Sequence, residues 1–217
     1  MNRRKTKWRN DVNPVEAVQS LLVEGPDSVL PDPDLVSYYI LEKERKIYFE
    51  QDVDNNIMAL HRMILRWNIE DKDIPVENRM PIKLYIFSYG GESDYMWSII
   101  DEIKASKTPV YTINTGIAAS AASMIFVAGH KRFMFPSSEV IIHQGSAEFA
   151  GDAVKVIDAT DSYKKLLEKM KQFYLENTNI PKAHLNKKRN NDWHLDSKYC
   201  LEHGVCHQIV ESLDEVI

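Results

Sequence analysis

The sequence predicts an α/β protein built on a largely parallel sheet. Between residues 82 and 143, short apolar runs typical of strands alternate with segments whose apolar residues recur at helical spacing. Repeated β-α-β order implies parallel strands joined by right-handed crossovers. A second observation is the amphipathic segment 151–176, which predicts one helix long enough to protrude from the body of the domain.

The composition fits a single domain of moderate size, or one domain with an arm. The chain has 217 residues, 44% of them hydrophobic, with a net charge of −5 and a pI near 5.8. An acidic balance gives no general attraction to nucleic acid or anionic membranes, and no apolar run reaches the length of about 18 residues that a membrane span needs. Two cysteines are too few for a disulfide scaffold, so we expect a reducing, cytoplasmic setting.

Residues 1–34 are interpreted as an N-terminal appendage and residues 35–217 as the main domain. The basic cluster at residues 3–9 is not followed by the apolar core of a signal peptide, which favours a loosely held tail. A short helix is predicted over residues 14–23, with Pro14 near its start. Proline and glycine between residues 25 and 33 end it and indicate a linker.

The first half of the main domain is predicted from β-type runs and one helical pattern. Strands are expected at 35–40, 45–50 and 82–87, where β-branched and aromatic residues cluster. Apolar residues at one-face spacing predict a helix within 52–70, which Asp54 would cap, and a second helix at 93–105.

The second half continues the alternation. Strands are predicted at 110–113, 132–135, 140–143 and 205–210, and helices at 118–128, 151–176 and 197–203, with a further short helix opened by Pro181. The 118–128 segment is apolar on nearly every face, so we expect this helix to be buried. Residues 190–193 are predicted to form a polar loop that can present a side chain freely.

Ser120 is the first candidate catalytic residue. It lies in the small-residue stretch GIAASAASM (116–124), which follows an apolar strand-like run. Small residues at a strand-to-helix junction expose a serine hydroxyl and leave the first amides of the helix free to bind an anion. Ser123 competes for the role, but its position inside the helix makes its hydroxyl less exposed. Either serine needs a base and an orienting carboxylate.

Two further strand ends carry residues that can complete such a site. Paired Gly90 and Gly91 follow the 82–87 strand, where backbone amides could bind a developing oxyanion, although an ordinary turn would look the same. His143 ends the 140–143 strand and could act as general base, although it could equally be a histidine satisfied at a sheet edge. In an open α/β sheet such strand ends gather at one site.

The orienting carboxylate is not fixed by the sequence pattern. The candidates are Asp152, Asp158, Asp161, Asp192 and Asp196, of which Asp192 lies in the predicted polar loop. A zinc site is an alternative use of the C-terminal residues His194, Cys200, His203, Cys206 and His207. Their spacing does not match common zinc patterns, so we interpret the cysteines as small buried thiols.

Together these segments resemble the ClpP family, the proteolytic subunits of ATP-dependent Clp proteases. The resemblance covers residues 35–212 in the series IYFEQDVDNN, SYGG, GIAASAASMIFVAGHKRF, PSSEVIIHQ, the long helix and NDWHLDSKYCLEHGV. It implies the crotonase-like ClpP fold and a Ser-His-Asp serine endopeptidase that needs no metal or organic cofactor. By resemblance Ser120 is the nucleophile, His143 the base and Asp192 the orienting acid. The oxyanion amides would be those of Gly91, with Gly90 beside it, and Ala121.

The resemblance also implies an assembly and partners. We expect a homo-oligomer of stacked rings that encloses the active sites, unfolded polypeptides as substrates and an AAA+ unfoldase as a partner. Tyr89 replaces the usual proline of SPGG, Ala122 replaces a frequent glycine, and residues 1–34 do not match the usual axial-loop sequence. Alternatives are a ClpP-like peptidase of viral assembly, a non-catalytic ring subunit, a crotonase-fold enzyme acting on acyl-CoA and a signal-peptide peptidase; His143 argues against the last of these.

Overall fold

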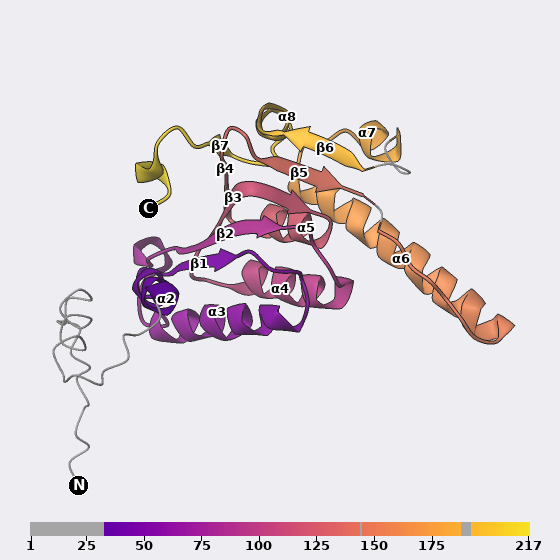
Figure 1. Cartoon of the computed structure of the whole chain (residues 1–217), viewed down its shortest axis with the longest axis horizontal. Coiled ribbons are helices and arrows are strands. Elements are labelled where there is room, and N and C mark those ends of the chain that lie inside the picture. The colour runs from indigo at the N-terminus through magenta and orange to yellow at the C-terminus, as the bar shows by residue number, and fades with distance from the viewer. Residues whose placement is uncertain (1–32, 144, 188–191) are drawn as a thin grey trace, which may run out of the picture. The chain divides into compact units, whose positions relative to one another are not determined.

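The computed structural model describes residues 33–143, 145–187 and 192–217 (Figure 1). The chain divides into two compact units, Met1–Arg45 and Lys46–Ile217, whereas the predicted boundary at residues 34/35 stays a prediction. The predicted basic tail and the helix over 14–23 lie outside the described residues.

The described part of the first unit is helix α2 (Pro33–Lys43), so the strand predicted at 35–40 is wrong. The apolar run in this segment does not alternate strictly with polar residues, and its ends carry helix signals. Proline occupies the first helical position, Asp34 lies in the first turn and Lys43 lies in the last turn, where each charge favours the helix dipole.

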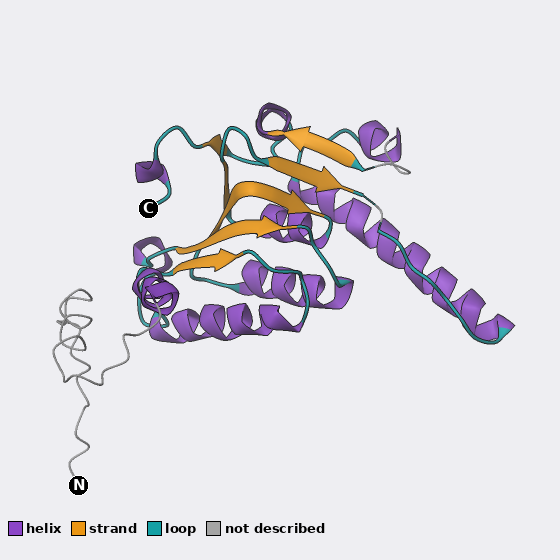
Figure 2. Cartoon of the chain, viewed as in Figure 1, coloured by secondary structure: helices purple, strands orange, loops and turns teal. Residues whose placement is uncertain are grey.

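The second unit is built on a mostly parallel sheet, as predicted. Parallel strands lie in the order β1 (Lys46–Phe49), β2 (Ile82–Ser88), β3 (Val110–Ala119), β4 (Lys131–Met134) and β7 (Gln208–Ile209). Strand β5 (Glu139–Ile142) pairs in parallel with the end of β3, and β6 (Trp193–Asp196) pairs antiparallel with β5. Figure 2 shows β3 as the long curved strand that both β4 and β5 accompany.

The helices of this unit pack in sequence against one another. A 3-10 turn η1 (Asn55–Ile57), capped by Asp54, leads into α3 (Met58–Glu70), which packs on α4 (Ser93–Ala105). Helix α4 packs on α5 (Ala121–Ala128), every residue of which is buried, and α5 packs on α6 (Ala153–Asn177). The remaining helical segments are η2 (Val76–Asn78), α7 (Lys182–Lys187), α8 (Ser197–Glu202) and η3 (Leu213–Glu215).

Strand β3 and its neighbours differ most from the sequence prediction. The strand runs to Ala119, so α5 begins at Ala121 and not at Ala118, because β5 pairs with the last residues of β3 and keeps them extended. Strand β6 begins at Trp193, the last residue of the loop predicted at 190–193, and was not predicted. Its four residues alternate between buried and exposed, but four residues are too few for the alternation to be recognised in the sequence. Strand β7 covers only two of the residues predicted at 205–210.

Helix α6 is the long helix that the sequence predicts. Phe173 and Tyr174 near its C-terminal end belong to the hydrophobic core. Its N-terminal part extends beyond the sheet (Figure 1), where Val154 and Ile157 are 67% and 60% exposed. A single monomer therefore leaves these two apolar side chains exposed to solvent.

Arg132 of β4 ties the sheet to the ends of several neighbouring segments. Its buried guanidinium donates hydrogen bonds to the carbonyl oxygens of Val127 (2.8 Å), Asn177 (3.1 Å) and Gly204 (2.8 Å). Burial lowers the pKa of Arg132 to about 10, so the side chain remains charged at neutral pH.

Candidate active site

Ser120 lies at the sharp turn between β3 and α5. Its backbone φ is 53°, a left-handed value that is uncommon outside glycine, and its amide donates to the carbonyl of Ile141 in β5 at 2.9 Å. The next residue, Ala121, opens α5, so its amide has no acceptor one turn back within the helix. The turn thus presents a serine beside the free N-terminal amides of a buried helix.

The Gly90-Gly91 loop is held against this turn. The carbonyl of Gly90 accepts a hydrogen bond from the Val53 amide at 2.8 Å, and Val53 accepts one from Glu92 at 2.7 Å, which leaves the Gly91 amide outside these bonds. The Gly90 amide instead donates to the Ser88 hydroxyl at 3.2 Å. A Cβ atom on Gly90 would lie 2.7 Å from the Cβ of Ser120, so only glycine fits beside the nucleophile candidate.

His143 and Asp192 are brought together by the pairing of β5 with β6. Ile142 pairs with Trp193 in antiparallel register, which makes His143 and Asp192 the next pair beyond the strands. Asp192 Oδ1 lies 4.0 Å from His143 Nδ1, a separation that permits charge attraction but no hydrogen bond. His143 Nδ1 accepts a hydrogen bond from the amide of Gly145 at 3.1 Å instead.

The other aspartates that the sequence left open are engaged elsewhere or stand apart. Asp152 caps α6 by accepting from the Lys155 amide at 3.1 Å, a bond that lowers the pKa of Asp152. Asp196 caps α8, Asp161 pairs with Lys164, and Asp158 is exposed on α6. In the described part of the chain, Asp192 is the aspartate that faces His143.

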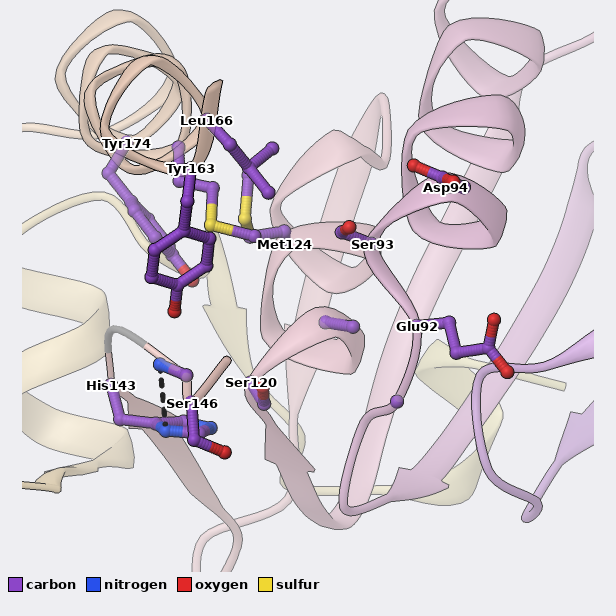
Figure 3. A pocket seen from close by; sticks show the side chains of 14 residues that line it. Glu92, Ser93, Asp94, Ser120, Met124, His143, Ser146, Tyr163, Leu166 and Tyr174 are labelled. Carbon is purple, nitrogen blue, oxygen red and sulfur yellow. Dashed lines mark hydrogen bonds between the residues drawn. The ribbon is translucent and has the colours of Figure 1, made fainter. Parts of the chain in front are cut away.

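A pocket of about 380 Å³ collects most of these groups (Figure 3). Ser120, Ala121, His143 and Gly91 line it, and in Figure 3 the His143 ring extends toward Ser120. Gly90 and Asp192 lie outside the lining. The rest of the wall has an apolar side from α5 and α6, an acidic edge at the start of α4, and small polar positions. These residues are Met124, Tyr163, Leu166, Met170 and Tyr174, then Glu92 and Asp94, then Ser93, Gly145 and Ser146.

Comparison with known proteins identifies the family. The family model described as Clp protease matches residues 34–213, more than half of the chain. The chain belongs to the Clp protease family. Membership indicates a peptidase, and the mostly parallel α/β sheet agrees with the fold predicted from the resemblance.

Three curated members of the Clp protease family illustrate the similarity. The ATP-dependent Clp protease proteolytic subunit of Deinococcus radiodurans is 29% identical over 184 residues, which cover 82% of this chain and 86% of that protein. Proteolytic subunit 2 of Treponema denticola is 33% identical over 138 residues, covering 63% of this chain and 69% of the relative. Proteolytic subunit 2 of Treponema pallidum is 32% identical over 133 residues, covering 60% and 67%.

Ser123, the other candidate serine, is buried behind Ser120 and does not line the pocket. The Ser123 side chain is buried, and its hydroxyl donates to the Ser120 carbonyl at 2.6 Å. The Tyr174 hydroxyl of α6 lies 2.6 Å from the same Ser123 oxygen and, since that proton is already used, Tyr174 donates to it. Burial raises the pKa of Tyr174 far above its usual value, which keeps the phenol a neutral donor.

The Tyr174–Ser123 pair was missed by sequence reasoning. Tyr174 falls on the apolar face of α6 and looked like a core aromatic. Ser123 looked only like a rival nucleophile. A buried hydroxyl needs a hydrogen-bond partner. A serine and a tyrosine on the apolar faces of two helices that pack together could therefore have been predicted to bond to each other.

Cys200 and Cys206 are buried free thiols, which confirms the structural interpretation of these residues. Burial raises the pKa of Cys206 to about 11 and that of Cys200 further, so both remain protonated near neutral pH. Across the described ranges, no helix is long and apolar enough to cross a membrane.

Proposed function

We propose that the chain is a serine endopeptidase of ClpP type, in which Ser120, His143 and Asp192 form the catalytic triad. The observation that carries this proposal is the position of Ser120 at a left-handed strand-to-helix turn, in one pocket with His143, which faces Asp192. Family membership supplies the peptidase activity that these three residues would perform.

Each residue has one role in the proposed reaction. Ser120 Oγ attacks the carbonyl carbon of a peptide bond while His143 takes its proton, and the carboxylate of Asp192 stabilises the imidazolium that forms. The amides of Gly91 and Ala121 bind the oxyanion, which is worth about 3 to 4 kcal/mol per donor at comparable sites. His143 then protonates the leaving amine, and water hydrolyses the acyl-enzyme through the same base.

His143 must change tautomer and move closer to Asp192 before the triad can react. Nδ1 of His143 accepts a hydrogen bond from Gly145, so in this arrangement Nδ1 carries no proton to offer Asp192. Catalysis requires the opposite tautomer, with Nδ1–H donated to Asp192 and Nε2 free to accept from Ser120. Closing the 4.0 Å gap to Asp192 and releasing the Gly145 amide would accomplish this change.

The same proposal includes an assembly of stacked rings that admits unfolded polypeptides to an internal chamber. Exposed apolar residues on the outer part of α6, including Val154 and Ile157, support a contact between copies. The relatives are named as subunits of ATP-dependent proteases, which supports an AAA+ unfoldase as partner. A cytoplasmic location is part of this proposal. Because all three triad residues are present, we favour an active peptidase over a non-catalytic ring subunit. A peptidase of viral assembly would use the same chemistry.

Labelling with a fluorophosphonate probe tests the nucleophile. The labelled peptide is mapped by mass spectrometry in the parent protein, Ser120→Ala and Ser123→Ala, with casein degradation measured in parallel. We expect Ser120→Ala to lose casein degradation and label at residue 120, and Ser123→Ala to keep label there. Casein degradation that survives Ser120→Ala would overturn the assignment. Light scattering after size exclusion tests the rings, which a monomer at working concentration would contradict.

A further inference from the structure

A second nucleophile, base and acid meet between α3 and α4, outside the pocket of Ser120. Ser98 and Glu102 are four residues apart in α4 and therefore lie on one face of that helix. His61 of α3 reaches both of them. Its Nε2 lies 3.0 Å from Ser98 Oγ, and its Nδ1 forms an ion-pair contact with Glu102 Oε2.

The accessibility of these side chains suits a reactive serine. The His61 and Glu102 side chains are 17% and 22% exposed, so their contact is largely shielded from water. Burial raises the pKa of Glu102, while the neighbouring His61 opposes that shift. Ser98, in contrast, is exposed. The outer member of the arrangement is therefore the one that a reagent in solution can reach.

His61 lies between the two groups that an activated serine requires, a hydroxyl and a carboxylate. One nitrogen faces the hydroxyl and the other faces a carboxylate that can hold the tautomer, whereas His143 lacks a carboxylate within hydrogen-bond distance. The Ser98 hydroxyl also lies 2.9 Å from the Tyr95 carbonyl, as is common for a serine in a helix. A hydroxyl has one proton and can rotate, so it can donate to His61 in its place.

We propose that Ser98, His61 and Glu102 form a second covalent site, at which Ser98 accepts an acyl group from an activated ester or thioester. Ser98 Oγ bonds to the acyl carbon as its proton passes to His61 Nε2. The bond from the acyl carbon to the leaving alcohol or thiol breaks, and that group takes the proton back from His61. The products are an O-acyl serine and the free alcohol or thiol, with no oxidation or reduction.

The surroundings of Ser98 limit the donor to an activated one. Ser98 lies in the interior of α4, where backbone amides are used by carbonyls one turn earlier. Ser120 directly precedes α5, whereas Ser98 does not lie at the start of its helix, so α4 offers no free amides beside Ser98 to bind a tetrahedral oxyanion. Peptide bonds need that stabilisation, whereas esters of good leaving groups react without it. The acyl group should consequently remain on Ser98 rather than turn over rapidly.

The test uses p-nitrophenyl acetate on the full-length Ser120→Ala protein, which removes the proposed main nucleophile. Acetylation of each serine is followed over time by peptide mass spectrometry. General-base assistance contributes about 10²- to 10⁴-fold. We therefore expect Ser98 to be acetylated at least about 10²-fold faster than Ser162, an exposed serine of α6 that has no histidine partner among the described residues.

Variants separate activation from mere exposure. His61→Gln keeps a polar side chain but no base, and should slow acetylation of Ser98 to the rate of Ser162. Glu102→Gln should slow it by a smaller factor, and Ser98→Ala should remove the adduct. Circular dichroism confirms that each variant is folded; if His61→Gln unfolds, the Glu102→Gln and Ser98→Ala results decide. Equal rates at Ser98 and Ser162, or an unchanged rate in Glu102→Gln, would overturn the proposal. None of these outcomes depends on whether Ser120 is the peptidase nucleophile.

Discussion

Gly90 gives the sharpest prediction, because its lack of a side chain positions the nucleophile. The change is Gly90→Ala. The new Cβ would lie 2.7 Å from the Ala119 carbonyl oxygen, 2.7 Å from the Ser120 Cβ and 2.9 Å from the Ala121 amide nitrogen. Most of these neighbours are backbone atoms that cannot rotate away, so the whole turn has to shift.

The size of the effect follows from two separate costs. Gly90 has φ of 101°, and an alanine held there costs about 1–3 kcal/mol. Relieving the contacts costs about 1–3 kcal/mol more, as for other overpacked sites. A domain with about 5–15 kcal/mol of stability remains folded after this loss. A displacement of about 1 Å in a reacting group, however, lowers a rate by about 10²-fold.

We therefore expect Gly90→Ala to fold with a lowered Tm and to react with a fluorophosphonate at residue 120 at least about 10²-fold more slowly. Gly151→Ala is the matched control. It has a comparable positive φ of 147°, but its Cβ would come no closer than 3.6 Å to Lys155 and touches nothing near the site. It should lose some stability and keep its labelling rate. A folded Gly90→Ala protein that labels at the parent rate would refute the idea that this loop fixes the nucleophile.

Three further predictions follow from buried polar groups. Tyr174→Phe removes the hydroxyl that donates to Ser123, so the free energy of unfolding measured in urea should fall by about 1 kcal/mol. Fluorophosphonate labelling of Ser120 should also slow, and Tyr174→Trp should not restore its rate. An unchanged labelling rate would show that Tyr174 contributes only to packing. Arg132→Met removes the donor from one buried carbonyl, that of Val127, and from two part-buried ones, those of Asn177 and Gly204. The buried carbonyl alone costs about 1–3 kcal/mol, so the unfolding midpoint should drop, and a midpoint equal to the parent's would contradict this. Burial raises the folded-state pKa of Cys206 to about 11 from an ordinary value of 9. The stability that the protonated thiol contributes is therefore complete below pH 9 and is lost as pH rises from 9 to 11. In Cys206→Ala the free energy of unfolding should change less with pH over this range.

Sequence patterns were enough to predict that Ser120, His143 and the Gly90-Gly91 loop lie near one another, because each follows a strand. Ser120 directly follows β3 and His143 directly follows β5, and parallel strands bring their carboxyl ends to one edge of the sheet. The choice of Asp192 came from resemblance alone. In physical terms it depends on the antiparallel pairing of β6 with β5, a long-range contact of four residues that no local period reveals.

Other features were hidden for different reasons. The short apolar run of α2 has no strict period, so it resembles a strand by composition, whereas the charged residues in its first and last turns favour a helix. The tautomer of His143 depends on the Gly145 amide, a contact set by loop conformation rather than by residue type. The His61–Glu102–Ser98 arrangement joins residues of two helices that are separated by strand β2, so only packing could bring it into view.

The hydrogen bond between Tyr174 and Ser123 also constrains how this gene can change in length. A helix turns about 100° for each residue, so one residue inserted in α6 shortly before Tyr174 would turn the phenol away from α5 and separate it from the Ser123 hydroxyl, which itself bonds the Ser120 carbonyl. Insertions near Val154, on the outer part of the helix, would leave that bond in register with the core. Length variation among descendants of this chain should therefore accumulate at the outer end of α6 and be purged close to Tyr174.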